Sequence, residues 1–173
     1  MEIRENYTRV TDPLSMFGKF DQIDPEVLRN AAERGTNIHL AISGYLADLG
    51  AVFDHKSYEL YFKSVKSWLD ERIFLPQPER WYDDELMLTG ECDAIYQDDN
   101  DLVLVDFKCT YMESKTWKLQ GSAYAYLARK NGYAITRVEF VRLKRDGKPC
   151  VVYTYKEDFE LYKKVLDVYR YFH

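Results

Sequence analysis

The spacing of apolar residues in the first part of the chain predicts helices after an irregular beginning. Residues 1–23 show no clear periodicity, whereas Asp24 followed by Pro25 is typical of a helix start, because Asp caps free N–H groups and Pro tolerates the first turn. A second helix is predicted over 57–71, where apolar side chains fall on one face. The prolines of the sequence PQP at 76–78 end this helical region.

The pattern then changes to one of strands. Two strands are predicted over 86–96 and 102–109, joined by the acidic turn QDDND. The second contains LVLVDF, which is apolar at consecutive positions, as expected of a strand covered on both faces. A helix over 117–129 follows, and then another strand pair, 137–143 and 150–155, around the Asp-Gly turn of KRDGK.

This order of elements predicts an α/β (α+β) fold with a central mixed β-sheet flanked by helices. A length of 173 residues is about that of one domain, and neither a repeat nor a Gly/Ser linker divides it. We therefore expect a single domain over 1–173, made of an irregular lead-in (1–23), a helical region (24–72), a sheet region (79–155) that contains a helix (116–130), and a terminal helix (156–172).

Composition and charge exclude few classes of function. No apolar run is long enough to cross a bilayer and the first residues lack a signal-peptide core, so we expect a soluble, cytoplasmic protein. Three cysteines, none in a CxxC pair, are too few for a four-thiolate zinc or iron–sulfur site. The net charge of −5 is uneven, because residues 1–100 carry −10 and residues 101–173 carry +5. This distribution permits nucleic-acid binding by the second half without arguing for it.

The sequence VDFKCT at 105–110 places an acid and a base on one strand. Asp106 and Lys108 are two residues apart, so their side chains project from the same face. Such groups at the end of an apolar strand are costly to bury without partners. The same pattern also fits a strand end that frays into solvent or a plain surface ion pair, and taken alone it favours these simpler explanations.

A second acid lies one hairpin away. Asp93, in GECDAI at 90–95, also stands between apolar residues, and antiparallel pairing across 97–101 would bring its carboxylate toward that of Asp106. Two such carboxylates repel each other unless a cation or a proton lies between them, and hard oxygen ligands suit Mg²⁺ or Mn²⁺. An Asp hydrogen-bonded to the backbone beside a turn explains Asp93 equally well, so the spacing leaves both interpretations open.

Four short motifs together resemble the PD-(D/E)XK nuclease superfamily, and within it the RecB-like exonuclease branch. They are RGTNIH at 34–39, GECD at 90–93, DFKCT at 106–110 and QGSAY at 120–124, in the order found in that branch. The resemblance implies a restriction-endonuclease-like core and an exonuclease of recombination, repair or phage-type DNA processing that uses Mg²⁺ or Mn²⁺. One departure is Cys109, which stands where many members have Thr directly after the Lys.

The resemblance also implies roles for the residues of the predicted site. Asp93 and Asp106 would hold the cation, with the backbone carbonyl of Phe107 and the side chain of His39 as further ligands. Lys108 would orient or activate the attacking water and offset charge that develops on the phosphorane.

Residues outside this set are assigned less directly. Gln120 and Tyr124 lie four apart on one helix face and would contact the site or the DNA backbone, although Tyr124 also suits the core. Glu79 is a further candidate acid, in competition with its acidic neighbours. Cations of the positive half that could contact phosphates, or simply be solvated, are Lys115, Lys118 and Arg129.

The partner implied by the resemblance is DNA. Compact members of this kind often form homo-oligomers around DNA or act beside a single-strand-annealing protein, and the chain has no helicase motif, so unwinding would need a helicase partner. Two other functions stay open: a structure-specific or restriction-type endonuclease with the same core, and a catalytically inactive DNA- or protein-binding module. Cleavage of closed circles would indicate the first, and the intact set of Asp93, Asp106 and Lys108 argues against the second.

Overall fold

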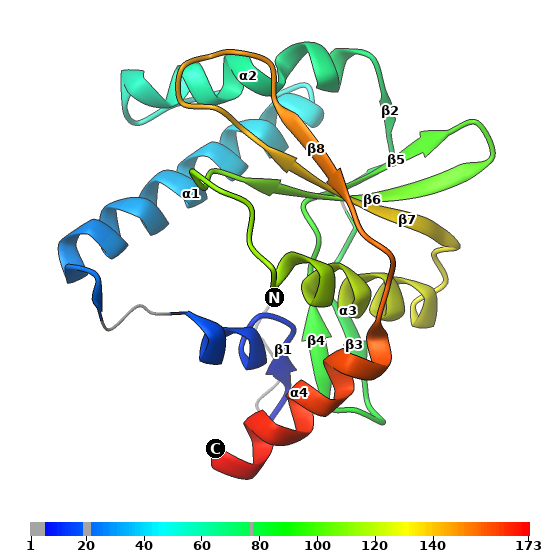
Figure 1. Cartoon of the computed structure of the whole chain (residues 1–173). Helices are drawn as coiled ribbons and strands as arrows, with labels where there is room; N and C mark the ends of the chain where they lie inside the picture. Colours follow the sequence, from blue (N-terminus) through cyan, green and yellow to red (C-terminus); the bar gives the residue numbers. More distant parts are fainter. Residues whose placement is uncertain (1–5, 19–21, 77) are drawn as a thin grey trace.

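Within the part of the chain that the structure describes, the larger of two β-sheets has five strands in the order β2-β5-β6-β7-β8, and the smaller has three in the order β1-β4-β3 (Figure 1). A computed structural model describes residues 6–18, 22–76 and 78–173. The strands of the larger sheet are β2 (Ile73–Phe74), β5 (Ala94–Asp98), β6 (Asp101–Lys108), β7 (Ile135–Arg142) and β8 (Val151–Thr154). Those of the smaller sheet are β1 (Thr8–Arg9), β3 (Trp81–Asp83) and β4 (Leu88–Gly90). The helices are α1 (Pro25–Leu46), α2 (Glu59–Asp70), α3 (Trp117–Lys130) and α4 (Phe159–Phe172), with short 3-10 helices η1 (Pro13–Phe17) and η3 (Lys56–Tyr58).

The larger sheet is mixed. β5 and β6 form an antiparallel hairpin in which Ala94 lies opposite Val105, whereas β6 and β7 are parallel and are connected through α3. β8 then pairs antiparallel with β7. The predicted fold class, an α/β arrangement with a central mixed sheet and flanking helices, is confirmed.

The two faces of β6 pack against different helices. Val103, Val105 and Phe107 join a buried cluster with residues of α1 and α2, whereas Leu104 belongs to a cluster with α3 and α4. Figure 1 shows the two pairs of helices on opposite sides of the sheet. Because side chains alternate along a strand, the even-numbered Asp106 is on the face toward α3. The polar end of β6 is therefore directed at α3.

The prediction of one continuous strand over 86–96 is wrong. It is two strands that belong to different sheets, β4 and β5, and the break between them includes Asp93. Gly90 at the break is crowded by α3, because a Cβ atom there would lie 2.9 Å from the Tyr124 ring. The close approach of α3 thus coincides with the break that places Asp93 directly before β5 of the central sheet.

The region 1–23 is not simply irregular. It contains β1, which pairs parallel with β4, and η1, although residues 1–5 and 19–21 lie outside the described part. The first strand of the central sheet, β2, also begins before residue 79. α4 packs against the beginning of the chain, since the Tyr162 hydroxyl donates to the Val10 carbonyl at 3.0 Å. Within the described ranges, no helix has the length and apolar character needed to cross a membrane.

Candidate active site

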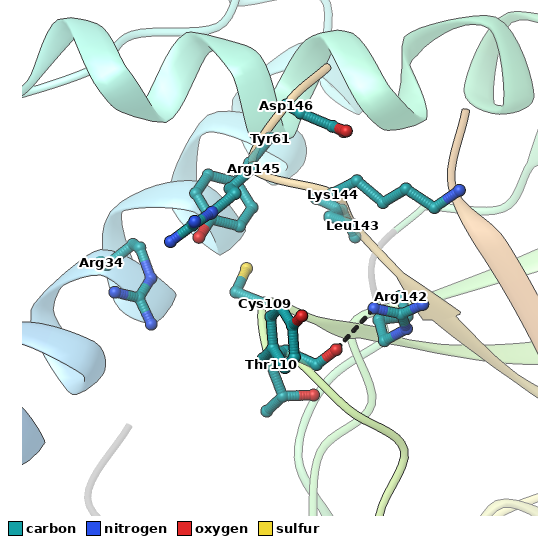
Figure 2. Close-up of a pocket in the computed structure, with 10 residues that line it drawn as sticks. Arg34, Tyr61, Cys109, Thr110, Arg142, Leu143, Lys144, Arg145 and Asp146 are labelled. Atoms are coloured by element: carbon teal, nitrogen blue, oxygen red, sulfur yellow. Dashed lines mark hydrogen bonds between the residues drawn. The ribbon is translucent and has the colours of Figure 1, made fainter. Parts of the chain in front are cut away.

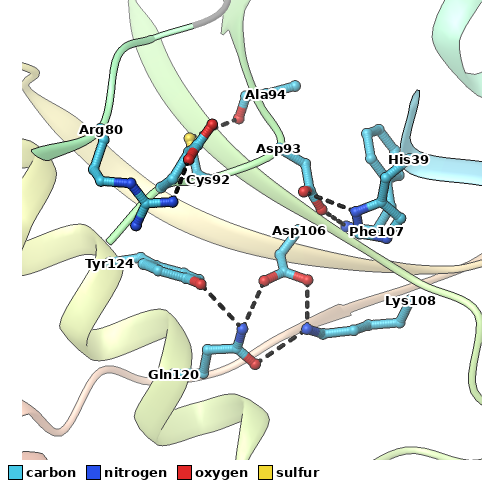
Figure 3. Close-up of polar contacts among 11 residues, drawn as sticks. His39, Arg80, Cys92, Asp93, Ala94, Asp106, Phe107, Lys108, Gln120 and Tyr124 are labelled. Carbon is cyan, nitrogen blue, oxygen red and sulfur yellow. Dashed lines mark hydrogen bonds and ion pairs between the residues drawn. The ribbon is translucent and has the colours of Figure 1, made fainter. Parts of the chain in front are cut away.

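Asp106, Lys108 and Gln120 form a closed ring of polar contacts between β6 and α3 (Figure 3). The Lys108 Nζ lies 2.6 Å from Asp106 Oδ1 and donates to Gln120 Oε1 at 3.1 Å. The Gln120 Nε2 donates to Asp106 Oδ2 at 2.9 Å. Asp106 and Gln120 are both buried. The predicted placement of Asp106 and Lys108 on one face of the strand is therefore confirmed, and both are oriented by the same amide.

Asp93 stands next to this ring at the beginning of β5. Its Oδ2 accepts a hydrogen bond from the Phe107 N–H at 2.6 Å, and its Oδ1 lies 3.0 Å from His39 Nδ1. His39 comes from α1, on the other side of the sheet from α3. Residues from four places in the sequence thus meet at the ends of β5 and β6.

The two carboxyl groups differ in their electrostatic surroundings. Burial would raise the pKa of Asp93, but His39, the Phe107 N–H and Lys108 outweigh burial and lower that pKa. Burial raises the pKa of Asp106, with Lys108 acting against the shift and Asp93 adding to it. Burial would lower the pKa of His39, but Asp93 raises it well above its usual value. His39 would therefore have to release a proton before it could bind a metal ion.

The donor atoms at this site fit a small hard cation. The buried Asp106 Oδ1 has one partner among the described residues, the Lys108 ammonium group at 2.6 Å. The Phe107 N–H points to Asp93, and in an extended strand the carbonyl of the same residue lies on that side too. Among the described residues, no three His, Cys, Asp or Glu side chains converge as ligands. One or two carboxylates with a carbonyl suit Mg²⁺, which keeps several waters.

Comparison with solved structures identifies the fold that carries this site. The alkaline exonuclease LHK-Exo from Laribacter hongkongensis matches with a TM-score of 0.53 and 12% identity, over 97% of this chain and 88% of that one. Its complex with dAMP matches with a TM-score of 0.52 and 9% identity, over 96% and 87%. A protein from Eubacterium rectale, provisionally named an exonuclease, gives 0.56 and 8%, over 99% and 84%. This chain shares its fold with these proteins.

A further structure, that of the protein SSO0001, matches with a TM-score of 0.59 and 14% identity, over 100% of this chain and 79% of that one. No protein-family model matches the chain, and no curated protein matches its sequence. Since the identities are low, these likenesses concern the arrangement of the sheet and helices. They assign no role to Asp93, Asp106 or Lys108.

Tyr124 is part of both the site and the core. Its ring packs against Gly90, and its hydroxyl lies 3.4 Å from the Gln120 Nε2, which donates to it. Burial raises the pKa of Tyr124, so the hydroxyl keeps its proton at any physiological pH. Tyr124 therefore supports Gln120 as a neutral hydrogen-bond partner, and it is not placed to act as a base.

Two of the three cations predicted to contact phosphates are engaged elsewhere. Lys118 pairs with Asp158 at 3.1 Å, and Arg129 pairs with Glu157 at 2.7 Å, so both join α3 to the start of α4. Lys115 is exposed in the segment before α3 and has no ion pair within the described residues. Phosphate contacts by Lys115, Lys118 and Arg129 all stay predictions, and in the structure Lys118 and Arg129 also join α3 to the start of α4.

Glu91, and not the candidate Glu79, lines a hollow together with Asp93. Glu79 is exposed and outside any strand, whereas Glu91 pairs with Arg80 at 2.6 Å, and both line a hollow of about 290 Å³ that also includes Asp93. The sequence reasoning missed this pair. Glu91 directly follows Gly90 within GECD, but only the break between β4 and β5 shows that it faces the site.

Gln120 offers a test of how the ring works. We expect Gln120→Ala to lower kcat of a reaction catalysed at this site by about 10–100-fold, because Asp106 and Lys108 lose the amide that fixes both, and small misplacements of reacting groups are costly. KM should change little, since Gln120 is buried behind them. Steady-state kinetics would separate the two effects. Gln97→Ala is the matched control, because that amide contacts only the turn at Asp99, and an equal loss there would contradict this role.

Proposed function

We propose that this chain is a nuclease that hydrolyses phosphodiester bonds of DNA with Mg²⁺ or Mn²⁺ as cofactor, and that it acts as an exonuclease. The observation that carries the proposal is the meeting of Asp93, Asp106 and Lys108 at the ends of two central strands. This arrangement lies on a fold shared with the exonuclease LHK-Exo, which also binds dAMP. A nucleotide ligand in that relative agrees with a nucleic-acid substrate for this chain.

The side chains divide the work of the reaction by their charge and position. Asp93 and Asp106, with the carbonyl of Phe107, would hold the cation. When bound, the cation supplies positive charge to the phosphate and makes water more acidic. Lys108 places a second positive charge within reach of the same phosphate and can orient the attacking water through its ammonium protons.

Burial makes these charges effective. Asp106 is 4% exposed, and the apolar residues Val105 and Phe107 on either side of it are buried. Charges in such surroundings interact more strongly than in water, and their positions are fixed before the substrate arrives. The site is therefore organised for a reaction in which negative charge accumulates on phosphate oxygens.

The decisive experiment compares linear and covalently closed circular DNA in the presence of Mg²⁺, Mn²⁺ or EDTA. We expect digestion of the linear DNA with either cation and none in EDTA, because the paired carboxylates need a cation to hold the phosphate. Equal digestion in EDTA would refute the cofactor assignment. Cleavage of the circles would indicate an endonuclease, and metal-dependent DNA binding without any cleavage would indicate an inactive binding module.

A further inference from the structure

A second hollow, of about 470 Å³, has on its wall Cys109, the residue that follows Lys108 of the candidate active site (Figure 2). We call it the basic hollow, and the residues that define it are Arg34, Tyr61, Cys109, Arg142, Lys144 and Arg145. Arg34 comes from α1, Tyr61 comes from α2, and the other cations come from the end of β7 and the turn after it. Arg34, the Arg of the RGTNIH motif, therefore lies in the basic hollow and is not one of the residues of the reaction centre.

The cations of the basic hollow are not neutralised. Within the described residues, Arg34, Arg142, Lys144 and Arg145 form no ion pair, and the one acid at the rim, Asp146, is held by Lys148 at 3.2 Å. Among the residues that the structure describes, the Nε atoms of Arg34 and Arg142 are buried without a hydrogen-bond partner, whereas Arg142 Nη1 donates to the Tyr111 carbonyl at 2.8 Å. Four like charges around one space repel each other, and buried donors without partners are costly, so this arrangement favours an anionic ligand.

The basic hollow is continuous with the reaction centre along β6. Cys109, on its wall, directly follows Lys108 and contacts His39. Arg142 lies opposite Lys108 in the pairing of β6 with β7. From Asp106 to Cys109 the chain advances about 10 Å, at roughly 3.3 Å per residue. That distance is the rise of about three nucleotides in one DNA strand.

We propose that the basic hollow binds a phosphate group of the same nucleic acid whose bond is cleaved at Asp106. The inference rests on the proposed nuclease function. One guanidinium group can donate two parallel hydrogen bonds to the oxygens of a phosphate. Arginines from α1 and from the end of β7 can contact one phosphate from two sides. The Tyr61 ring, with Arg34 at 5.8 Å from its centre, forms an apolar wall on which a sugar or base can pack.

The phosphate can come from the interior of the strand or from its end. Both sources present the same oxygens to the same arginines, and they differ in the substrate that they select. An internal phosphate guides a strand past the reaction centre, whereas a terminal phosphate makes a free end a condition of binding. The experiment therefore uses short single-stranded oligonucleotides with and without a terminal phosphate.

The test is the affinity of the full chain for these oligonucleotides in EDTA, measured by fluorescence anisotropy over a series of salt concentrations. The variants are Arg34→Gln and Arg145→Gln, which lie on different elements, and the matched control is Lys164→Gln, on the exposed side of α4. We expect each arginine variant to bind about tenfold more weakly. The salt slope should also fall by about 0.7 for each lost phosphate contact. Lys164→Gln should behave as wild type.

The outcomes separate the two proposals. A difference between variant and wild type that persists without the terminal phosphate assigns the basic hollow to an internal phosphate, and one that disappears assigns it to the strand end. If both arginine variants bind every oligonucleotide as wild type does, or if Lys164→Gln loses as much, the basic hollow is not a phosphate site, even when the wild type cleaves DNA. If the arginine variants bind more weakly than wild type but the wild type never cleaves DNA, the result would support the phosphate site and refute the nuclease.

Discussion

Lys108→Ala should lower the rate of DNA cleavage by about 10²–10³-fold at saturating Mn²⁺ while metal binding is retained. The ammonium group lies 2.6 Å from Asp106 Oδ1, so its removal takes positive charge away from the place where the phosphate would be attacked. The carboxylates of Asp93 and Asp106 remain, and the loss of a neighbouring cation should leave their metal affinity equal or slightly higher.

Two measurements on the same variant test this expectation. Calorimetric titration with Mn²⁺ reports the metal affinity, and cleavage of linear duplex at saturating Mn²⁺ reports the rate. Lys164→Ala removes the same charge from the exposed side of α4 and should leave both unchanged. A Lys108→Ala variant that cleaves at nearly the wild-type rate would make the β6 end a structural feature and remove the centre of the nuclease proposal.

Asp106→Asn should lose metal binding and cleavage together. The substitution keeps the shape of the side chain but removes the charge that a divalent cation needs from it. Wild type should be stabilised by Mn²⁺, by about 2.7 kcal/mol at a concentration about a hundredfold above Kd. For a domain of this size that is a rise in Tm of roughly 5–10 °C. Asp106→Asn should show little or none of this rise.

Thermal unfolding with and without Mn²⁺ measures the effect independently of activity. The matched control is Asp167→Asn, an exposed position on α4, which should keep the full metal-dependent rise. An Asp106→Asn variant that is stabilised by Mn²⁺ as strongly as wild type would place the cation elsewhere. Because each protein is compared with itself, any change in stability caused by the lost charge alone does not enter the result.

Local patterns predicted the parts of the site that depend on one strand or one helix. The apolar run of β6 and the two-residue spacing of Asp106 and Lys108 specify a strand with one polar face, and the structure confirms both. The i, i+4 spacing likewise placed Gln120 and Tyr124 together. Such features need only the periodicity of the backbone, which the sequence states directly.

Features that depend on distant partners were not predictable in the same way. Lys118 and Arg129 appeared free in the sequence, but their partners Asp158 and Glu157 lie 40 and 28 residues further on. The break between β4 and β5 follows Gly90, where α3 and Val10 leave no room for a side chain. Pairings of this range leave no local signal, so the basic hollow, built from four separate segments, was not predicted from the sequence either.

The joining of β1 to α4 has a consequence for how the protein is made. Thr11 and its neighbours form the wall of the hollows beside Asp93 and Gln120, and this segment is held by Tyr162 and Arg170 of α4. During synthesis the reaction centre can gather its charged residues early, but its wall can close only after α4 has left the ribosome. Contacts of such long sequence separation form slowly. The hollows beside Asp93 and Gln120 are therefore completed only once α4 has packed against the segment that contains Thr8 and Val10.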